Sequence, residues 1–330
     1  MSSHPDSSGP ERILAVATGY MAAKQLFAAS ENGLFAALAQ GPAGVADLAA
    51  RTGLPERTAR ILADAMSGLG LLTRTDGVYA NSPTVARYLA GSGDDVDLRP
   101  FLAFLDAISY PHWLAFGETA RTAKPGDLDL GGDRMGVFMN GVMTYNALHA
   151  KMLAENYDFS RHQRALDLGG LSAAFLTEAM TAAPGLQGTF FTGEFMIEGA
   201  KSAIEAAGLS DRFEVVAGDP VTDETPTGFD LVLLEHVAHR YDAEQNRRII
   251  ERARTAAAPG ATLILLDFFL DSDEEQRTID ALHAAEYLVI DGTVVYPEDE
   301  VRGWLRDAGW EPVETRALPG SPRVIIAEAR

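Results

Sequence analysis

Apolar residues in the second half of the chain form short runs that alternate with segments of helical spacing. The apolar runs lie at 164–168, 188–192, 213–216, 230–234, 262–268 and 323–328. Helical segments separate several of them, at 172–183, 197–207, 243–257 and 298–308. This alternation predicts an α/β fold with a mostly parallel sheet and helices on both faces. The turn at 319–322 predicts that the final strand folds back as a hairpin partner.

A different pattern occupies the N-terminal region. Residues 11–40 carry apolar side chains at helical spacing, which predicts an amphipathic helical region. Two further helices are predicted at about 45–50 and 56–69, and an Asp76-Gly77 turn between two apolar pairs predicts a hairpin. A helix-turn-helix followed by a hairpin is the pattern of a winged helix.

The charge of the chain decides how this winged helix is interpreted. Arg57 and Arg60 lie on its second predicted helix, but the chain of 330 residues has a formal net charge of −20. Nucleic-acid binding needs Lys and Arg side chains to neutralise phosphates. We therefore predict no nucleic-acid partner, interpret the winged helix as a packing and dimerisation module, and expect a small-molecule substrate.

Other features of the composition bear on the location of the protein. The sequence has no cysteine and no apolar run close to the roughly 20 residues that span a bilayer. Its first residues contain neither the basic nor the apolar segment of a signal peptide. We expect a disordered tail over 1–11, no membrane partner and a cytoplasmic location.

Polar and aromatic residues gather in the helical section over 96–160. Buried polar groups need hydrogen-bond partners, so such residues on an apolar helix indicate either a pocket wall or a satisfied core. Both interpretations stay open. The predicted substrate pocket comprises Tyr110, Trp113, Phe138, Asn140, Met143, Tyr145, Asn146 and His149, together with His283 and Glu286 from a later helix.

The stretch from Arg164 to Phe175 reads as a buried strand, a glycine turn and the start of a helix. Gly169 and Gly170 allow a ligand to approach the backbone, and the helix start offers free N–H groups. This order predicts a nucleotide-shaped crevice. A fully glycine-rich loop has glycine where this chain has Leu171 and Ala173, so we expect both side chains to stand where a cofactor passes.

Six pieces of sequence, in order, resemble the two-domain small-molecule O-methyltransferases that use S-adenosylmethionine (SAM), such as the caffeate, hydroxyindole and anthracycline types. The resemblance covers about 12–328 and implies a Rossmann-like class I methyltransferase sheet at 161–330, a helical linker and pocket section at 96–160, a winged-helix dimerisation domain at 12–95 and a homodimer through the N-terminal helices. The matching pieces begin at Leu166, Ala207, Ala217, Phe229, Val237 and Ala258.

The resemblance also implies how SAM is bound. The family's glycine loop, which wraps the methionine end of SAM, corresponds to Asp167, Gly169 and Gly170. The family's third-strand acid, close to adenine, corresponds to Asp219, which Pro220 follows.

Two further departures from the family concern SAM and the base. Thr192 stands where the family has a ribose-binding acid, and Glu194 takes that role if the turn is shifted. Arg240 follows the family's histidine base, where the family commonly has Asp.

Histidines follow the fourth strand of the predicted sheet, at the edge where open α/β sheets bind ligands. The resemblance assigns His239 as the base that deprotonates the acceptor hydroxyl, and an imidazole titrates in the range this needs. The predicted catalytic set is His239, Arg240 and His236. An alternative is a metal held by His236, His239 and His283 with Glu235, Asp267 or Glu286, although we predict no metal.

Three functions are compatible with these observations. The first is O-methyl transfer from SAM to a hydroxyl or enol of an aromatic or polyketide-like natural product. The second is a methyltransferase fold that has lost methyl transfer, with or without the loss of SAM binding, and catalyses cyclisation, rearrangement, elimination or hydroxylation. The third is a non-catalytic binding module. The leading prediction is the methyltransferase, because of the number of matching motifs.

Overall fold

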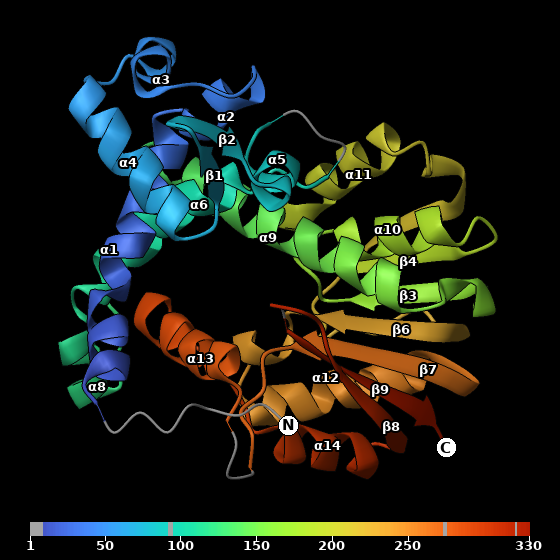
Figure 1. The fold of residues 1–330 in the computed structure, drawn as a ribbon. Coiled ribbons are helices and arrows are strands. Elements are labelled where there is room, and N and C mark those ends of the chain that lie inside the picture. The colour runs from blue at the N-terminus through green and yellow to red at the C-terminus, as the bar shows by residue number, and fades with distance from the viewer. Residues whose placement is uncertain (1–8, 92–94, 273–275, 321) are drawn as a thin grey trace. The chain divides into compact units, whose positions relative to one another are not determined.

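The computed structural model describes residues 9–91, 95–272, 276–320 and 322–330 (Figure 1). The chain divides into two compact units, Met1–Pro111 with Leu130–Tyr145 and His112–Asp129 with Asn146–Arg330. Residues 1–8 of the predicted tail lie outside the described residues, and the first helix already begins at Glu11. The predicted boundaries near 95 and 160 stay predictions.

The first unit is mainly helical. The helix α9 (Arg134–Asn156) and the short α7 (Tyr110–Trp113) contain the points where the chain passes between the units. The other elements of the first unit are α1 (Glu11–Glu31), α2 (Leu34–Ala39), α3 (Val45–Thr52), α4 (Glu56–Gly68), β1 (Leu72–Thr75), β2 (Val78–Asn81), α5 (Pro83–Tyr88), α6 (Arg99–Phe104) and the π-helix η1 (Leu105–Ser109).

The predicted winged helix is confirmed. Helices α3 and α4 precede the antiparallel pair β1–β2, in which Leu72 lies opposite Asn81. Asp76 and Gly77 both have positive φ angles, of 51° and 80°, as a tight two-residue hairpin turn requires. Buried side chains from all of these elements pack together, including Leu34, Phe35, Leu48, Met66 and Tyr79.

The amphipathic region predicted over 11–40 is only partly right. The second half of α1 buries Phe27 and Ala29 within the unit. The first half does not, because Ile13 and Val16 keep 73 % and 77 % of their surface exposed. The apolar side chains at the start of α1 therefore stay largely exposed among the described residues of the single chain.

The second unit is built on a seven-stranded sheet, and the predicted architecture is confirmed. The strand order is β5-β4-β3-β6-β7-β9-β8, in which the first five strands are parallel and β9 is antiparallel to both of its neighbours. The strands are β3 (Arg164–Leu168), β4 (Gln187–Thr192), β5 (Phe213–Ala217), β6 (Phe229–Glu235), β7 (Ala257–Asp267), β8 (Trp310–Ala317) and β9 (Arg323–Ala329).

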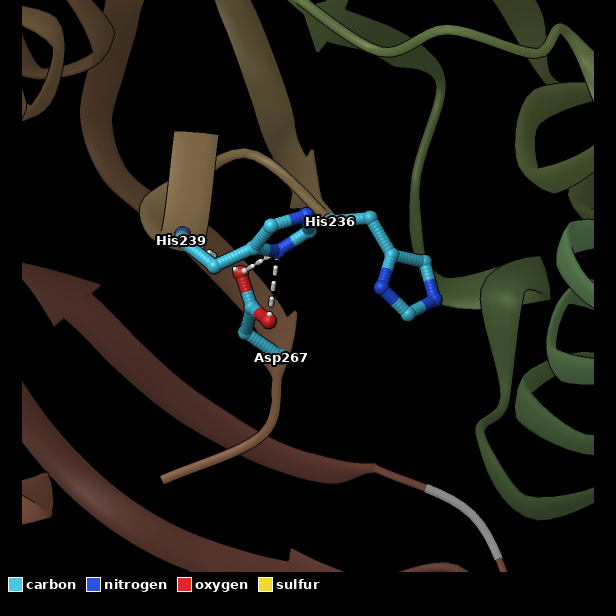
Figure 2. Close-up of side chains that lie close together, drawn as sticks. All are labelled: His236, His239 and Asp267. Carbon is cyan, nitrogen blue, oxygen red and sulfur yellow. Dashed lines mark hydrogen bonds and ion pairs between the residues drawn. The ribbon is translucent and has the colours of Figure 1, made fainter. Parts of the chain in front are cut away.

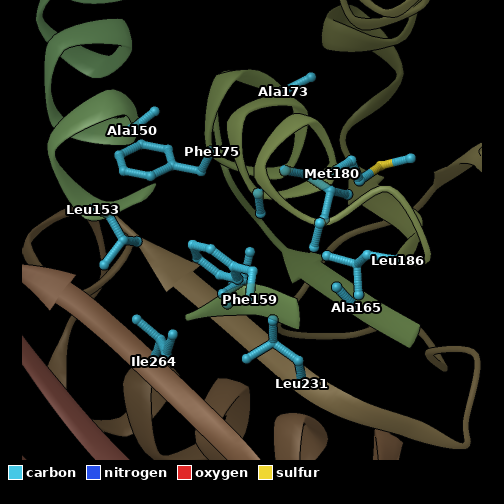
Figure 3. Packing of buried hydrophobic residues seen from close by; sticks show 14 of the residues in the cluster. Ala150, Leu153, Phe159, Ala165, Ala173, Phe175, Met180, Leu186, Leu231 and Ile264 are labelled. Atoms are coloured by element: carbon cyan, nitrogen blue, oxygen red, sulfur yellow. The ribbon is translucent and has the colours of Figure 1, made fainter. Parts of the chain in front are cut away.

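Helices cover both faces of this sheet, because successive strand residues point to opposite sides. Figure 3 shows one core, where α9 and α10 (Ala174–Ala182) pack on residues such as Leu231 and Ile264. The other core holds α12 (Ala243–Ala256) and α14 (Glu298–Asp307). The remaining helices are α8 (Phe116–Thr122), α11 (Ile197–Ala206), α13 (Thr278–Ile290) and the single turns η2 (Phe159–Arg161), η3 (Glu194–Met196), η4 (Ser210–Arg212) and η5 (Ala238–Arg240).

One strand was absent from the predicted set. Among the described strands, β8 lies at the sheet edge, pairs with β9 alone, and includes Pro312. Trp310 and Pro312 are buried, but its other residues are exposed or half-buried and several are charged, so they form no apolar run. Proline and charge are typical of edge strands, which need to pair on one side only. Among the described helices, none is long and apolar enough to cross a membrane.

Candidate active site

The carboxyl ends of the parallel strands surround a cavity of about 580 Å³ within the second unit. Open α/β sheets bind ligands at this edge. The loops after β3, β4, β5 and β6 contribute Gly169, Leu171, Thr192, Gly193, Glu194, Phe195, Met196, Ala217, Gly218, Asp219, Pro220, Asp223, Arg240 and Tyr241 to its lining.

The turn after β3 requires both of its glycines. Gly169 has a φ angle of 82°, in the left-handed region that favours glycine. A Cβ atom on Gly170 would lie 2.6 Å from Oδ1 of Asp167, well inside contact distance. The backbone here forms a cradle that side chains would fill, as a closely bound cofactor requires.

The obstruction expected from the loop side chains is partly wrong. Ala173 is buried in the core beside α10, and it does not line the cavity. Leu171 does line the cavity. The loop therefore brings one bulky side chain, Leu171, to the cavity wall, and it keeps both glycines of the turn.

Thr192 has a structural role in this loop. Its side chain is buried, and Oγ1 donates a hydrogen bond of 3.0 Å to the carbonyl oxygen of Gly170. The hydroxyl therefore ties the end of β4 to the glycine turn. Glu194 begins the single turn η3, and this exposed carboxylate lines the same cavity.

Asp219 and Pro220 lie on the loop after β5. Oδ1 of Asp219 accepts a hydrogen bond of 2.7 Å from the backbone N–H of Val221, which shapes the turn. Gly218 precedes them where a Cβ atom would lie 2.1 Å from the ring of Phe191. This close packing holds the β5 loop against β4, with Asp219 and Pro220 at the cavity wall.

A buried pair of acids lies beneath the glycine turn. Asp167 of β3 and Glu235 of β6 are 0 % and 2 % exposed, on adjacent strands, and their carboxyl groups are within hydrogen-bonding reach. None of the four oxygens accepts a well-formed hydrogen bond from the described N–H and O–H groups. Burial raises the pKa of both carboxyl groups, and in Glu235 the charge of Asp167 adds to it. A shared proton therefore satisfies the pair.

The segment after β6 is shaped by a buried asparagine. Nδ2 of Asn246 on α12 donates to the carbonyl oxygens of Ala238 and Tyr241, at 2.9 Å each. Asp242 and Gln245 form a capping box at the start of α12. These bonds hold the turn η5, which carries His239 and Arg240, at the end of β6.

His239 and Asp267 form a hydrogen-bonded dyad, which Figure 2 shows. Nδ1 of His239 lies 3.0 and 3.1 Å from the two carboxylate oxygens of Asp267, the last residue of β7. Burial by itself raises the pKa of Asp267, but the charge and hydrogen bond of His239 outweigh it and hold this pKa below its usual value. The contact with a carboxylate makes Nδ1 the protonated nitrogen, so Nε2 is left as a base.

His236 has a different partner. Its Nε2 lies 2.9 Å from Nδ1 of His149, and both rings are buried. Burial lowers the pKa of His236 to about 3 and that of His149 well below its usual value, so both imidazoles are neutral at pH 7. His236 also has a positive φ angle of 54°, and Figure 2 marks no hydrogen bond between its ring and Asp267.

The positions of His236, His239 and Asp267 also test the alternative of a bound metal. His236, His239 and Asp267 each offer one ligand atom within 4.8 Å of the others. The other proposed ligands have separate contacts. His283 stacks on Phe268 with ring centroids 3.8 Å apart, and Glu286 accepts a hydrogen bond from Nε1 of Trp113. The hydrogen bonds of the cluster favour a dyad and a histidine pair over a metal centre.

The residues predicted to line a substrate pocket divide between the two units. In the first unit, Tyr145 stacks on Phe101 at 4.2 Å, and Phe138 contacts Phe104 edge to face at 5.7 Å. Tyr110 packs beneath Lys24, while Asn140 is exposed and Met143 half-buried. In the second unit, Asn146 and His149 are buried. Their role in substrate binding stays a prediction.

Sequence reasoning missed the roles of three residues of this site. Asp267 and Glu235 entered it only as alternative metal ligands, although each is an acid at the end of an apolar strand, which is a recognisable signal. Tyr287 had no signal at all. It stacks on the ring of His239 at 4.1 Å from the middle of α13.

Comparison with known proteins identifies the family. Models of an O-methyltransferase domain and an O-methyltransferase dimerisation domain match residues 113–311 and 14–91. The 3-hydroxy-5-methyl-1-naphthoate 3-O-methyltransferase of Streptomyces sahachiroi is 34% identical, over 97% of this chain and 96% of its own length. The tetracenomycin 8-O-methyltransferase TcmO of Streptomyces glaucescens is 27% identical, over 99% and 98%.

A solved structure agrees with these matches along nearly the whole chain. The SAM-dependent methyltransferase SibL, in its apo form, is 28% identical with a TM-score of 0.84, covering 97% of this chain and 99% of its own. The alternative in which the fold has lost methyl transfer is not favoured. The chain belongs to the O-methyltransferase family, whose members transfer the methyl group of SAM to a small-molecule hydroxyl.

Proposed function

We propose that the protein methylates a hydroxyl of an aromatic or polyketide-like natural product, with His239 as the general base. The observation that carries this proposal is the His239–Asp267 dyad at the strand ends, beside the glycine cradle. Relatives of this chain act on a naphthoate, on tetracenomycin polyketide intermediates and on mitomycin compounds. Their acceptors support a fused-ring, hydroxyl-bearing substrate.

The residues of this chain account for the proton that leaves the acceptor. Asp267 holds the Nδ1–H tautomer of His239, so Nε2 is free to remove the hydroxyl proton. The oxygen becomes a stronger nucleophile, and the imidazolium that forms is stabilised by the buried carboxylate. Tyr287, stacked on the imidazole, restricts the ring orientation. SAM, when bound, supplies a methyl group activated by its sulfonium.

Different residues of the cavity bind the methionine, ribose and adenine parts of SAM in this proposal. Gly169 and Gly170 surround the methionine end, where the backbone turn leaves space. Glu194 supplies the ribose-binding carboxylate, in place of Thr192, whose hydroxyl is used within the loop. Asp219 and Pro220 lie beside adenine. His236 supports the site through its contact with His149. A cytoplasmic location stays a prediction.

Calorimetry and turnover test this function together. We expect SAM and its demethylated product, S-adenosylhomocysteine (SAH), to bind with micromolar dissociation constants. Mass spectrometry is expected to detect a mass gain of one methyl group on a hydroxynaphthoate or a related hydroxylated polyketide. No binding of either ligand at millimolar concentration would rule out methyl transfer from SAM.

The exposed start of α1 is proposed as a homodimer surface. Ile13 and Val16 are among its exposed apolar residues, in a segment that overlaps the matched dimerisation domain. Replacing both with Asp is expected to convert a dimer into a monomer of 35.3 kDa, measured by light scattering after size-exclusion chromatography. Arg12→Glu, in the same exposed turn, is the charge-changing control and keeps the dimer. A monomeric wild type, or a dimeric double variant, contradicts this surface.

A further inference from the structure

Arg240 brings a half-buried positive charge to the cofactor cavity. Nη2 donates a hydrogen bond to the carbonyl oxygen of Gly169, and the side chain lines the cavity wall. Nε is buried without a hydrogen-bond partner among the described residues. Within the described part of the chain, no carboxylate forms an ion pair with this guanidinium.

The charges of two acids, Asp267 and Asp167, attract the guanidinium of Arg240, but neither carboxyl group lies within ion-pair distance of it. Each has another partner, since Asp167 lies against Glu235 and Asp267 binds His239. A guanidinium stays charged at every physiological pH, and a buried charge without a counterion costs several kcal/mol. Arg240 therefore places a charge at the cavity wall that no described carboxylate contacts directly.

A carboxylate is the anion that fits a guanidinium best, because two parallel N–H groups match its two oxygens. SAM carries one at the end of its methionine moiety. If Glu194 and Asp219 hold the nucleoside, the methionine moiety extends along the Gly169–Gly170 turn, which Arg240 contacts. The family resemblance predicts an Asp at this position, so the charge beside the base is reversed in this chain.

We propose that Arg240 binds the carboxylate of the methionine moiety of SAM, an inference that rests on the proposed function. A carboxylate on the aromatic acceptor has the same chemistry and is the second source that the experiment has to separate. The contact of Arg240 with the glycine turn favours the cofactor as the source.

Three ligands that differ in one group test this assignment by calorimetry. SAH carries the full amino-acid moiety, decarboxylated SAH lacks only the carboxylate, and 5′-methylthioadenosine lacks the whole amino-acid moiety. Arg240→Gln is expected to weaken SAH binding by about 10- to 100-fold, the effect of losing a charged hydrogen-bonded pair. Both other ligands are expected to bind within about twofold of the wild type, since neither has the carboxylate.

Arg248→Gln is the matched control, because Arg248 lies on the exposed face of α12 and pairs with Glu244. It is expected to bind all three ligands as the wild type does. Arg240→Lys keeps the charge but lacks the planar guanidinium. Its affinity for SAH is expected to lie between those of the wild type and Arg240→Gln, and its affinities for the other two ligands are expected to match the wild type. If Arg240→Gln does not fold, as judged by circular dichroism, Arg240→Lys decides the question by the same comparison.

Two results would overturn the assignment. An equal loss of affinity for 5′-methylthioadenosine means that Arg240 supports the loop rather than a carboxylate. Unchanged SAH affinity, with a raised KM only for acceptors that carry a carboxylate, places the anion on the substrate. Failure of the proposed function looks different, because the wild type then binds neither SAH nor 5′-methylthioadenosine.

Discussion

Replacing His239 with alanine is expected to lower kcat by about a hundredfold to ten-thousandfold, while SAH affinity stays unchanged. This is the usual contribution of a positioned general base. His239 contacts Asp267 and Tyr287 and is absent from the residues lining the cofactor cavity, so its loss removes proton transfer without removing cofactor contacts. Steady-state kinetics measures kcat with an unmethylated acceptor that the wild-type enzyme converts, and calorimetry measures the SAH affinity.

Two further variants separate a base from a structural histidine. Asp267→Asn keeps the shape of the dyad but removes the charge that holds the Nδ1–H tautomer, so kcat also falls. His162→Asn removes a histidine that is bound to Tyr157 before the start of β3, at the opposite end of the strands. It is expected to keep kcat. Full turnover by the His239→Ala enzyme would eliminate His239 as the base.

Replacing Glu235 with Gln is expected to raise the free energy of unfolding at pH 8, because the wild type loses stability there through the raised pKa of this buried carboxyl. The folded protein keeps the pKa of Glu235 well above its usual value, because the side chain is buried beside Asp167. Below about pH 4 the carboxyl is protonated in both states and contributes nothing. As the pH rises, the Glu235 carboxyl ionises in the unfolded chain before it does in the folded protein. The free energy of unfolding therefore falls between the unfolded and the folded pKa of this group.

Gln does not titrate, and its amide can donate a hydrogen bond to Asp167. The variant is therefore expected to lose less stability between pH 5 and pH 8 than the wild type. Chemical denaturation followed by circular dichroism at several pH values gives the free energies. Glu205→Gln, on the exposed side of α11, is the control and is expected to change the pH dependence of the free energy of unfolding little. Parallel pH profiles for wild type and Glu235→Gln would show that no shared proton stabilises the pair.

Some features depend on contacts between distant segments, which the sequence alone did not show. Ala173 looked like an obstruction in the loop, yet the packing of α10 buries it in the core. Thr192 looked like a lost cofactor contact, yet its hydroxyl bonds Gly170, 22 residues earlier in the chain. His236 stood beside the base in sequence, but its ring pairs with His149, 87 residues away.

The sequence by itself determined the alternation of strands and helices, the winged helix and the position of His239 after β6, because local periodicity and turn chemistry carry that information. It did not reveal β8, an edge strand with one partner and charged residues. Only the tertiary structure decided that Asp267 orients His239, that Asp167 meets Glu235, and that no described carboxylate forms an ion pair with Arg240. Such pairings arise where separate strands end side by side, and no local pattern encodes which side chains meet there.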